Sequence, residues 1–414
     1  MTQSRTTVIF YWFILAIVIF FYGFESLLRS APDSLSKLGY GLSNGLSGNE
    51  KDSITGLIKS YYYFSYVPLQ LIAGPMVDRY GVRHVLIAST LLLFIGLILS
   101  GFASPSYSYL IYTGRFLIGA GSAFAFVCVI TTATYLVPND INFASGLSSG
   151  VGLLFASYIG VEVIQIINSI QSFFILSIVI CMILLILILM FVKIPKARQE
   201  SIQCWPQILK AYLHLFKSLN IWVIGIIGAI LFLPIILFSD FGNNVIPMLF
   251  QYEGTSQEVS DFIKIMKSTL AVGFIVGSPL IGFLSKNHDR ARLMITFSCL
   301  LSCIVFSLFT FHIIPGFIAQ GFMVFVLGLL ISAEILVFPL ASSTVPSNLT
   351  GSAVACANFF VMIPGLLGQT IQTRLAEASS DNTFILIMPI ILLLAFLMSF
   401  FIKSNKGTQS ATTN

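Results

Sequence analysis

Long apolar stretches recur along the whole chain, and most of them have the length of a membrane-crossing helix. A helix needs about 20 apolar residues to cross the hydrocarbon core of a bilayer. Only 9% of the 414 residues are charged, against about 25% in a soluble domain, so lipid must surround most side chains. We predict an all-α membrane protein with twelve transmembrane helices, at 8–28, 54–76, 85–102, 109–137, 143–165, 173–192, 221–250, 259–284, 293–311, 317–340, 352–371 and 384–402.

The basic residues predict the orientation of these helices. An even number of spans puts both termini on one side of the membrane, and Lys and Arg gather on the cytoplasmic side of membrane proteins. We expect both termini in the cytoplasm, because that side would then hold 13 of the 21 basic residues: Arg5, Arg79, Arg83, Lys193, Lys196, Arg198, Lys210, Lys217, Lys286, Arg290, Arg292, Lys403 and Lys406.

A more polar stretch, 193–220, separates two groups of six predicted helices. Its apolar residues recur at helical spacing opposite its basic ones, as in a helix that lies on a membrane surface. The two sets are Ile208, Leu209, Tyr212, Leu213 and Phe216, and Lys210, His214 and Lys217. We predict an N-terminal six-helix bundle at 1–192, a cytoplasmic linker with an amphipathic helix at 193–220, and a C-terminal six-helix bundle at 221–414.

The loop between the second and third predicted helices carries a closely spaced set of glycines and charges. Gly74 permits close approach of a neighbouring helix, and Gly81 gives the backbone freedom of a tight turn. Asp78 can accept hydrogen bonds from helix N-termini or from arginine. Arg79 and Arg83 suit the basic side of the membrane.

This loop fits the pattern G-x-x-x-D-R-x-G-x-R/K and resembles the signature loop of the major facilitator superfamily. Arg115, followed by Gly119, Ala120 and Gly121, is similar to the fourth-helix arginine of that superfamily. The resemblance covers nearly the whole chain and implies two six-helix bundles, with the loop latching them together on the cytoplasmic side. The other reading of the loop is that its arginines only obey the charge rule for cytoplasmic loops.

Two shorter stretches, 21–32 and 65–70, look like the phagosomal-transporter branch of intracellular bacterial pathogens. Members of that branch are proton-driven importers of amino acids, nucleosides or iron chelates. The resemblance therefore implies a bacterial inner membrane as the location of the protein.

Charged residues within lipid depth are the first functional candidates, because they are costly to keep there. Tyr22, Glu25 and Arg29 share one face of the first helix. We expect Glu25, Arg29, Arg115 and Glu162 to form a cluster that faces a central cavity, where an acid would carry protons and the cations would hold a substrate carboxylate. The alternative is an ion-pair network that only ties helices together.

Three further polar residues lie inside spans. Glu334 stands alone in the tenth helix and must be protonated, paired or in contact with water; it suits either proton coupling or a structural role. Asn244, beside a predicted break in the seventh helix, and Asn358 could bind a solute or join two helices. Tyr62 and Tyr66 share a helix face, and either packing or a cavity position would explain them.

Lys59 and Lys267 occupy equivalent positions in the two halves. They lie 208 residues apart, as do Gly74 and Gly282. The two lysines could flank an anionic ligand, or their ammonium groups could extend to the membrane surface.

These observations predict a secondary active transporter that works by alternating access. We expect a proton-coupled importer of a small polar solute such as an amino acid; the alternative is an importer of a carboxylate siderophore or another organic anion. A non-transporting receptor is disfavoured because the chain lacks large soluble loops, and an exporter is the weaker reading. No Walker loop, zinc set or nucleophile pattern is present, so we expect no enzyme activity, cofactor, metal or nucleic-acid partner. We expect a monomer in the lipid bilayer.

Overall fold

A computed structural model of the chain describes residues 5–41, 48–103, 107–194, 205–375 and 383–403. Nine helical stretches within these residues are long and apolar enough to cross a membrane. One of them, Ser53–Gly101, holds two predicted spans, because its backbone leaves the helical conformation at Gly81 (φ 77°, ψ 157°). Two further helices, α15 (Thr350–Leu375) and α16 (Thr383–Ser399), complete the twelve predicted spans, and the all-α membrane fold is confirmed.

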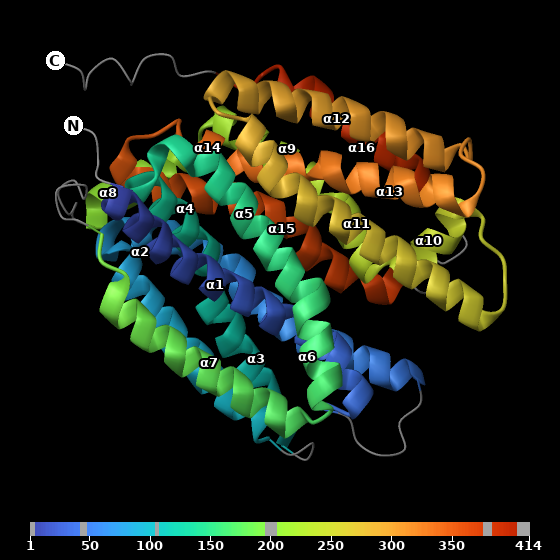
Figure 1. Cartoon of the computed structure of the whole chain (residues 1–414), viewed down its shortest axis with the longest axis horizontal. Helices are drawn as coiled ribbons and strands as arrows, with labels where there is room; N and C mark the ends of the chain where they lie inside the picture. Colours follow the sequence, from blue (N-terminus) through green and yellow to red (C-terminus); the bar gives the residue numbers. More distant parts are fainter. Residues whose placement is uncertain (1–4, 42–47, 104–106, 195–204, 376–382, 404–414) are drawn as a thin grey trace.

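The first half of the molecule contains six spans, several of them built from more than one helix. Breaks in regular helix separate α3 from α4, and a π-helical segment, η4, separates α5 from α6 (Figure 1). The elements are α1 (Arg5–Leu35), α2 (Gly48–Gly101), α3 (Ser108–Ser122), α4 (Ala125–Leu136), α5 (Ile141–Leu154), η4 (Phe155–Ile159), α6 (Gly160–Ile167) and α7 (Ile170–Phe191).

The second half repeats this arrangement after the short helix α8 (Trp205–Phe216). Its seventh span breaks between α9 and α10, as the sequence predicted, and its tenth span contains a 3₁₀ segment, η6. The elements are α9 (Leu219–Asp240), α10 (Gly242–Phe250), α11 (Ser256–Leu284), α12 (His288–Thr310), α13 (Phe317–Ile331), η6 (Ser332–Leu336), α14 (Val337–Ser342), α15 (Thr350–Leu375) and α16 (Thr383–Ser399). Residues 195–204 of the predicted linker lie outside the described residues.

The two halves meet most closely at one end of the molecule. Chain direction places the start of α1, the turn at Gly81 and the end of α16 at this end, and we refer to it as the terminal face. Figure 1 shows α8 at the same end. A Cβ atom at Gly74 would lie 2.5 Å from the Ser352 Cα, and one at Gly146 would lie 2.1 Å from the Ser278 carbonyl oxygen. Glycines therefore let the backbones of the two halves touch here.

Within the residues that the structure describes, five side chains of the first half are hydrogen-bonded to backbone groups of the second half. The Ser352 hydroxyl is an additional side-chain donor. Four of these contacts lie toward the terminal face, and the fifth, made by Tyr158, lies toward the opposite face. The pairs are Asp78 with Gly351 and Ser352, Tyr135 with Ser347, Asn142 with Ser285, Ser145 with Ile335, and Tyr158 with Ser268.

Candidate functional site

A narrow cavity lies between the two halves. Its space open to water centres is about 40 Å³, which holds about three water molecules. Most of its wall is apolar, and the polar lining residues come from both halves: Tyr22, Arg29, Tyr66 and Ser149 from the first, and Glu334 and Asn358 from the second. A solute larger than a few water molecules would therefore need the halves to move apart slightly.

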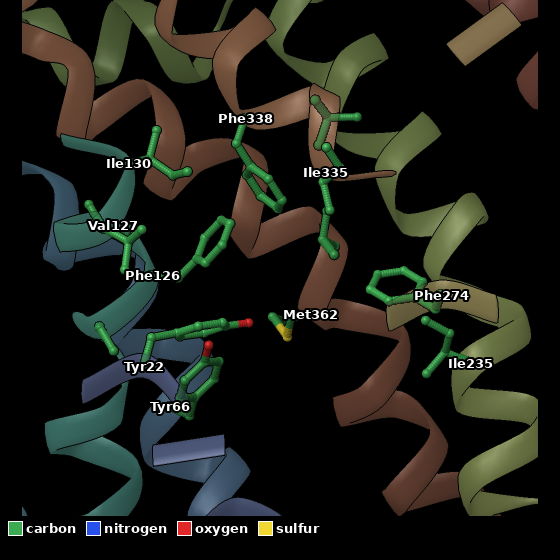
Figure 2. Packing of buried hydrophobic residues seen from close by; sticks show 14 of the residues in the cluster. Tyr22, Tyr66, Phe126, Val127, Ile130, Ile235, Phe274, Ile335, Phe338 and Met362 are labelled. Carbon is green, nitrogen blue, oxygen red and sulfur yellow. The ribbon is translucent and has the colours of Figure 1, made fainter. Parts of the chain in front are cut away.

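An aromatic pair closes the cavity on the side of the terminal face. Phe126 of α4 and Phe338 of α14 have ring centroids 4.5 Å apart with their planes at 69°. Both helices run from this point toward the terminal face, so the pair lies between the cavity and that face. Figure 2 shows the hydroxyl groups of Tyr22 and Tyr66 close to each other beneath this pair, with Met362 of the second half across from them.

Several cavity residues lie where regular helix is interrupted. Glu334 belongs to the 3₁₀ segment η6, and Phe126 follows directly on the break between α3 and α4. Tyr22 packs against Gly152, where a Cβ atom would lie 2.6 Å from its ring, one turn before the π-helical segment η4. Such interruptions in helices are frequent at functional sites, and here they aim side chains between the halves.

Glu25 lies behind the cavity wall and not in it. Its side chain is fully buried, accepts a hydrogen bond of 2.8 Å from the Tyr62 hydroxyl, and is 3.3 Å from the Ser26 hydroxyl. The carboxylate interacts electrostatically with Arg29, one helical turn further along α1. Arg29 itself lines the cavity. Glu25 is therefore placed to balance the charge of a cation that a solute can reach.

Arg115 also points away from the cavity. Its guanidinium donates hydrogen bonds to the backbone carbonyls of Leu28, at 2.8 Å, and Arg29, at 3.3 Å. The same group lies 5.2 Å from the centre of the Tyr62 ring, and only 3% of the residue is exposed. This geometry fastens α3 to the end of α1, and Arg115 is not among the residues that line the cavity.

Two buried groups of the second half have unused hydrogen-bonding capacity in the cavity. Glu334 is 4% exposed and makes no hydrogen bond or ion pair with any residue that the structure describes. The Asn358 amide nitrogen has no hydrogen-bond partner among those residues, although Tyr66 lies close to the Asn358 side chain. A buried polar group without a partner is costly, so both groups are candidates for contact with a solute or water.

The other predicted site residues lie elsewhere. Lys59 forms an ion pair of 3.1 Å with Asp33, and Lys267 donates to the Ser239 carbonyl, at 3.1 Å, and to Asn243, at 3.2 Å. Glu162 is exposed on α6. The predicted grouping of Glu25, Arg29, Arg115 and Glu162 around the cavity is thus not found, since Arg29 is the member that lines it. The Asn244 side chain lies outside the described part of the chain.

The aromatic pair and Ser149 were not among the predicted site residues. Phenylalanines in an apolar helix give no signal that separates a cavity position from ordinary packing. Ser149 lies in a helix that contains several small residues, which are common wherever membrane helices touch. Its cavity position follows only from the packing of α5 against the second half.

In the loop at the terminal face, Asp78, Arg79 and Arg83 each contact another helix. The Asp78 carboxylate accepts hydrogen bonds from the backbone N–H groups of Gly351 and Ser352, at the start of α15. Arg83 donates to the Leu189 carbonyl of α7 at 2.6 Å. The Arg79 guanidinium lies 5.2 Å from the ring centre of Trp205 in α8. The loop thus joins α2 to helices of both halves.

Comparisons with known proteins agree with this architecture. The family model described as Major Facilitator Superfamily matches residues 14–369. The proton:xylose symporter XylE has a similar structure, with a TM-score of 0.70, 16% identity and 97% of each chain covered. So does FucP, a fucose:proton symporter of E. coli, with a TM-score of 0.71, 15% identity, and 95% of this chain and 100% of FucP covered.

A curated relative shares a shorter stretch with this chain. It is the probable sulfoacetate transporter SauU of Cupriavidus necator, 31% identical over 94 residues. The match covers 22% of this chain and 21% of that protein, so the chain spans about a fifth of the length of this relative.

Proposed function

Because the chain belongs to the Major Facilitator Superfamily, and so is a multi-pass membrane transporter of a small molecule, we propose that it imports a zwitterionic solute such as an amino acid together with protons. One observation carries this proposal. A cation of the first half, Arg29, and an acid of the second half, Glu334, line the same narrow cavity. A solute with both a negative and a positive group can contact both halves at once.

The cavity offers a distinct partner for each end of such a solute. The Arg29 guanidinium can bind a carboxylate through two parallel hydrogen bonds, and the unpartnered Asn358 amide nitrogen supplies another donor. The hydroxyls of Tyr22 and Tyr66 can accept from an ammonium group, which suits a polar site between largely apolar walls. The small volume favours a compact solute.

We assign proton coupling to Glu334. An acid at membrane depth must be protonated, paired or in contact with water, and Glu334 has no basic partner among the described residues. In the proposed cycle it takes up a proton while the cavity communicates with the face opposite the termini. After the halves rock and the terminal face opens, water reaches Glu334, the proton leaves, and the solute is released. We place both termini on the cytoplasmic side of a bacterial inner membrane, so this cycle moves the solute into the cell.

An organic anion is the second candidate. The partial similarity to a probable sulfoacetate transporter and the presence of Arg29 in the cavity favour it. The other three cations that could grip an anion are engaged elsewhere: Arg115 with backbone carbonyls, Lys59 with Asp33, and Lys267 with Ser239 and Asn243. A bulky siderophore would also need the halves to separate further than a small solute would, so a small anion is the form of this alternative to test.

Uptake into proteoliposomes tests the proposal. A pH gradient, acidic outside, should drive accumulation of a radiolabelled amino acid, and collapse of the gradient should reduce uptake to equilibration. A thermal-shift screen of amino acids and small organic anions identifies the solute to label, because a ligand that binds the folded state raises its stability. Uptake that ignores the gradient would overturn the coupling. Binding of anions without any binding of zwitterions would instead support the second candidate.

A further inference from the structure

Helix α8 has three chemically different sides. Ile208 and Tyr212 are buried against the rest of the protein. On the neighbouring side Leu209 and Leu213, one turn apart, are 52% and 53% exposed, and Trp205, a turn before Leu209, is 38% exposed. At 3.6 residues per turn, these three residues form one continuous apolar strip beside the buried side.

The third side is cationic. Lys210 and His214 are exposed on it, and Lys217, the residue that directly follows α8, is exposed on the same side. In the described part of the chain, the side chains of these two lysines have no ion-pair or hydrogen-bond partner. Around the helix, the order is therefore protein contact, exposed apolar strip and positive charge. A helix at the boundary between acyl chains and anionic headgroups has this order of surfaces.

The apolar strip of α8 continues into surfaces that face lipid. Leu219 and Trp222, at the start of α9, are 82% and 39% exposed, and Tyr80 at the end of the second span is 47% exposed. The Trp205 ring lies 5.8 Å from that of Tyr80. Because the strip contacts the end of one membrane-spanning helix at Tyr80 and is followed in the chain by the start of another, α9, the bilayer surface itself is the occupant that fits it.

Helix α8 also contacts both halves of the molecule next to the Asp78 hydrogen bonds. Trp205 lies under the Arg79 guanidinium of the first half. At the other end of α8, Phe216 stacks on Phe360 of α15 with ring centroids 6.2 Å apart and an interplanar angle of 17°. If the halves separate at the terminal face, α8 must lose one of these two contacts. A force that holds α8 in place therefore holds the terminal face closed.

We propose that α8 binds anionic phospholipid headgroups and thereby stabilises the conformation in which the terminal face is closed. Leu209 and Leu213 enter the acyl-chain region, and Lys210 and Lys217 contact headgroup phosphates. Each lysine near an anionic membrane surface changes binding by about fivefold. Removal of both lysine charges should therefore weaken lipid binding by about 25-fold.

Quenching of Trp205 fluorescence tests the lipid contact. The protein is reconstituted in nanodiscs that contain either brominated phosphatidylglycerol or brominated phosphatidylcholine, at the same fraction of the lipid. The fluorescence of the Trp205→Phe variant is subtracted from that of the natural chain to give the Trp205 signal. We expect stronger quenching by the anionic lipid. Lys210→Gln/Lys217→Gln should remove the difference between the lipids. The control Lys51→Gln/Lys264→Gln, which changes two exposed lysines on the opposite face, should retain it.

Hydrogen exchange tests the coupling to the terminal face. The amides of Gly351 and Ser352 donate to Asp78, so their exchange reports opening of this contact. We expect phosphatidylglycerol to slow their exchange in the natural chain and not in Lys210→Gln/Lys217→Gln. Exchange of the Thr255 amide, bonded to Glu258 within the second half, should not respond.

The two measurements separate the parts of the inference without any transport assay. Quenching that is the same for both headgroups would overturn the lipid site. Headgroup-dependent quenching without a change in the exchange of Gly351 and Ser352 would overturn the control of the terminal face.

Discussion

The Asp78 carboxylate of the first half accepts two hydrogen bonds from Ser352 of the second half. The backbone N–H donates at 2.9 Å and the hydroxyl at 2.6 Å, and the Gly351 N–H adds a third donor at 2.8 Å. A carboxylate at the N-terminus of a helix satisfies N–H groups that have no partner within the helix, and it complements the helix dipole. The start of α15 is thus held to the end of the second span by the Asp78 carboxyl group.

Substitution of Asp78 by Asn should shift the molecule toward opening of the terminal face. The amide carries no charge, and its NH₂ group replaces one of the two acceptor oxygens. This NH₂ donor would face the N–H donors of Gly351 and Ser352. A loss of about 1–3 kcal/mol, or about 5- to 150-fold in the open-to-closed ratio, should appear as faster exchange of the Gly351 and Ser352 amides. Asp140→Asn, an exposed acid near the same face, is the control. Equal exchange in the two variants would contradict the role of Asp78.

Substitution of Gly74 by Ala should have the same effect without any change of charge. The added methyl would lie 2.5 Å from the Ser352 Cα and 2.6 Å from the Gly351 carbonyl oxygen, so the backbones must separate. Overpacking of this kind costs about 1–3 kcal/mol. Gly56→Ala, in the same helix with nothing within 4 Å, should be neutral or stabilising by up to about 1 kcal/mol. Accessibility labelling of the terminal face should separate the two variants.

The two buried acids should differ in their transport phenotypes. Glu334→Gln removes the proposed proton carrier, so accumulation driven by a pH gradient should be lost. Counterflow, in which labelled solute outside the vesicle exchanges with unlabelled solute inside, should remain. Glu25→Gln keeps the hydrogen bond from Tyr62 but removes the charge beside Arg29, so KM should change and coupling should persist. Proteoliposome uptake and counterflow measure both. Intact gradient-driven accumulation in Glu334→Gln would move the proton-carrying role to another residue.

Arg115→Lys should lower stability and leave solute preference unchanged. A lysine cannot reproduce the two hydrogen bonds of the guanidinium to the carbonyls of α1. A loss of about 1–3 kcal/mol should appear as a lower Tm. Lys59→Gln breaks the ion pair with Asp33, whose side chain is 57% exposed, and should cost at most about 1 kcal/mol. A change in solute preference in Arg115→Lys would show that Arg115 reaches the solute after all.

The spans and the break in the seventh helix could be predicted because they depend on properties of contiguous sequence. Hydropathy over about 20 residues identifies a crossing whatever its neighbours are, and Gly242 beside Asp240 interrupts a helix locally. The turn at Gly81 was likewise visible, since its φ of 77° favours glycine. The prediction of Glu334 and Asn358 as candidates rested on the rarity of polar groups in a span.

The direction in which a side chain points was harder to predict. The π-helical segment Phe155–Ile159 holds more residues per turn than an α-helix, so every later residue of this span is rotated relative to a regular helix. Glu162 follows that segment and is exposed. The partners of Arg115 are backbone carbonyls 86 and 87 residues away, and a backbone carbonyl leaves no trace in a sequence pattern.

Five hydrogen-bonding contacts between the described parts of the two halves use different kinds of atoms on their two sides, and this difference bears on variation among related sequences. At each one the first half supplies a particular side chain, whereas the second half supplies mainly main-chain atoms that any residue carries. A saturation screen should therefore find few tolerated replacements at Asp78, Tyr135 or Tyr158, and many at Ser347 and Ser268, which are the partners of the two tyrosines and are not buried. Gly351 is an exception, because a Cβ atom there would lie 2.6 Å from the Asp78 Oδ1 atom. Paired substitutions across this boundary should be scarce for the same reason, so searches for correlated changes would underestimate how closely the two bundles are joined.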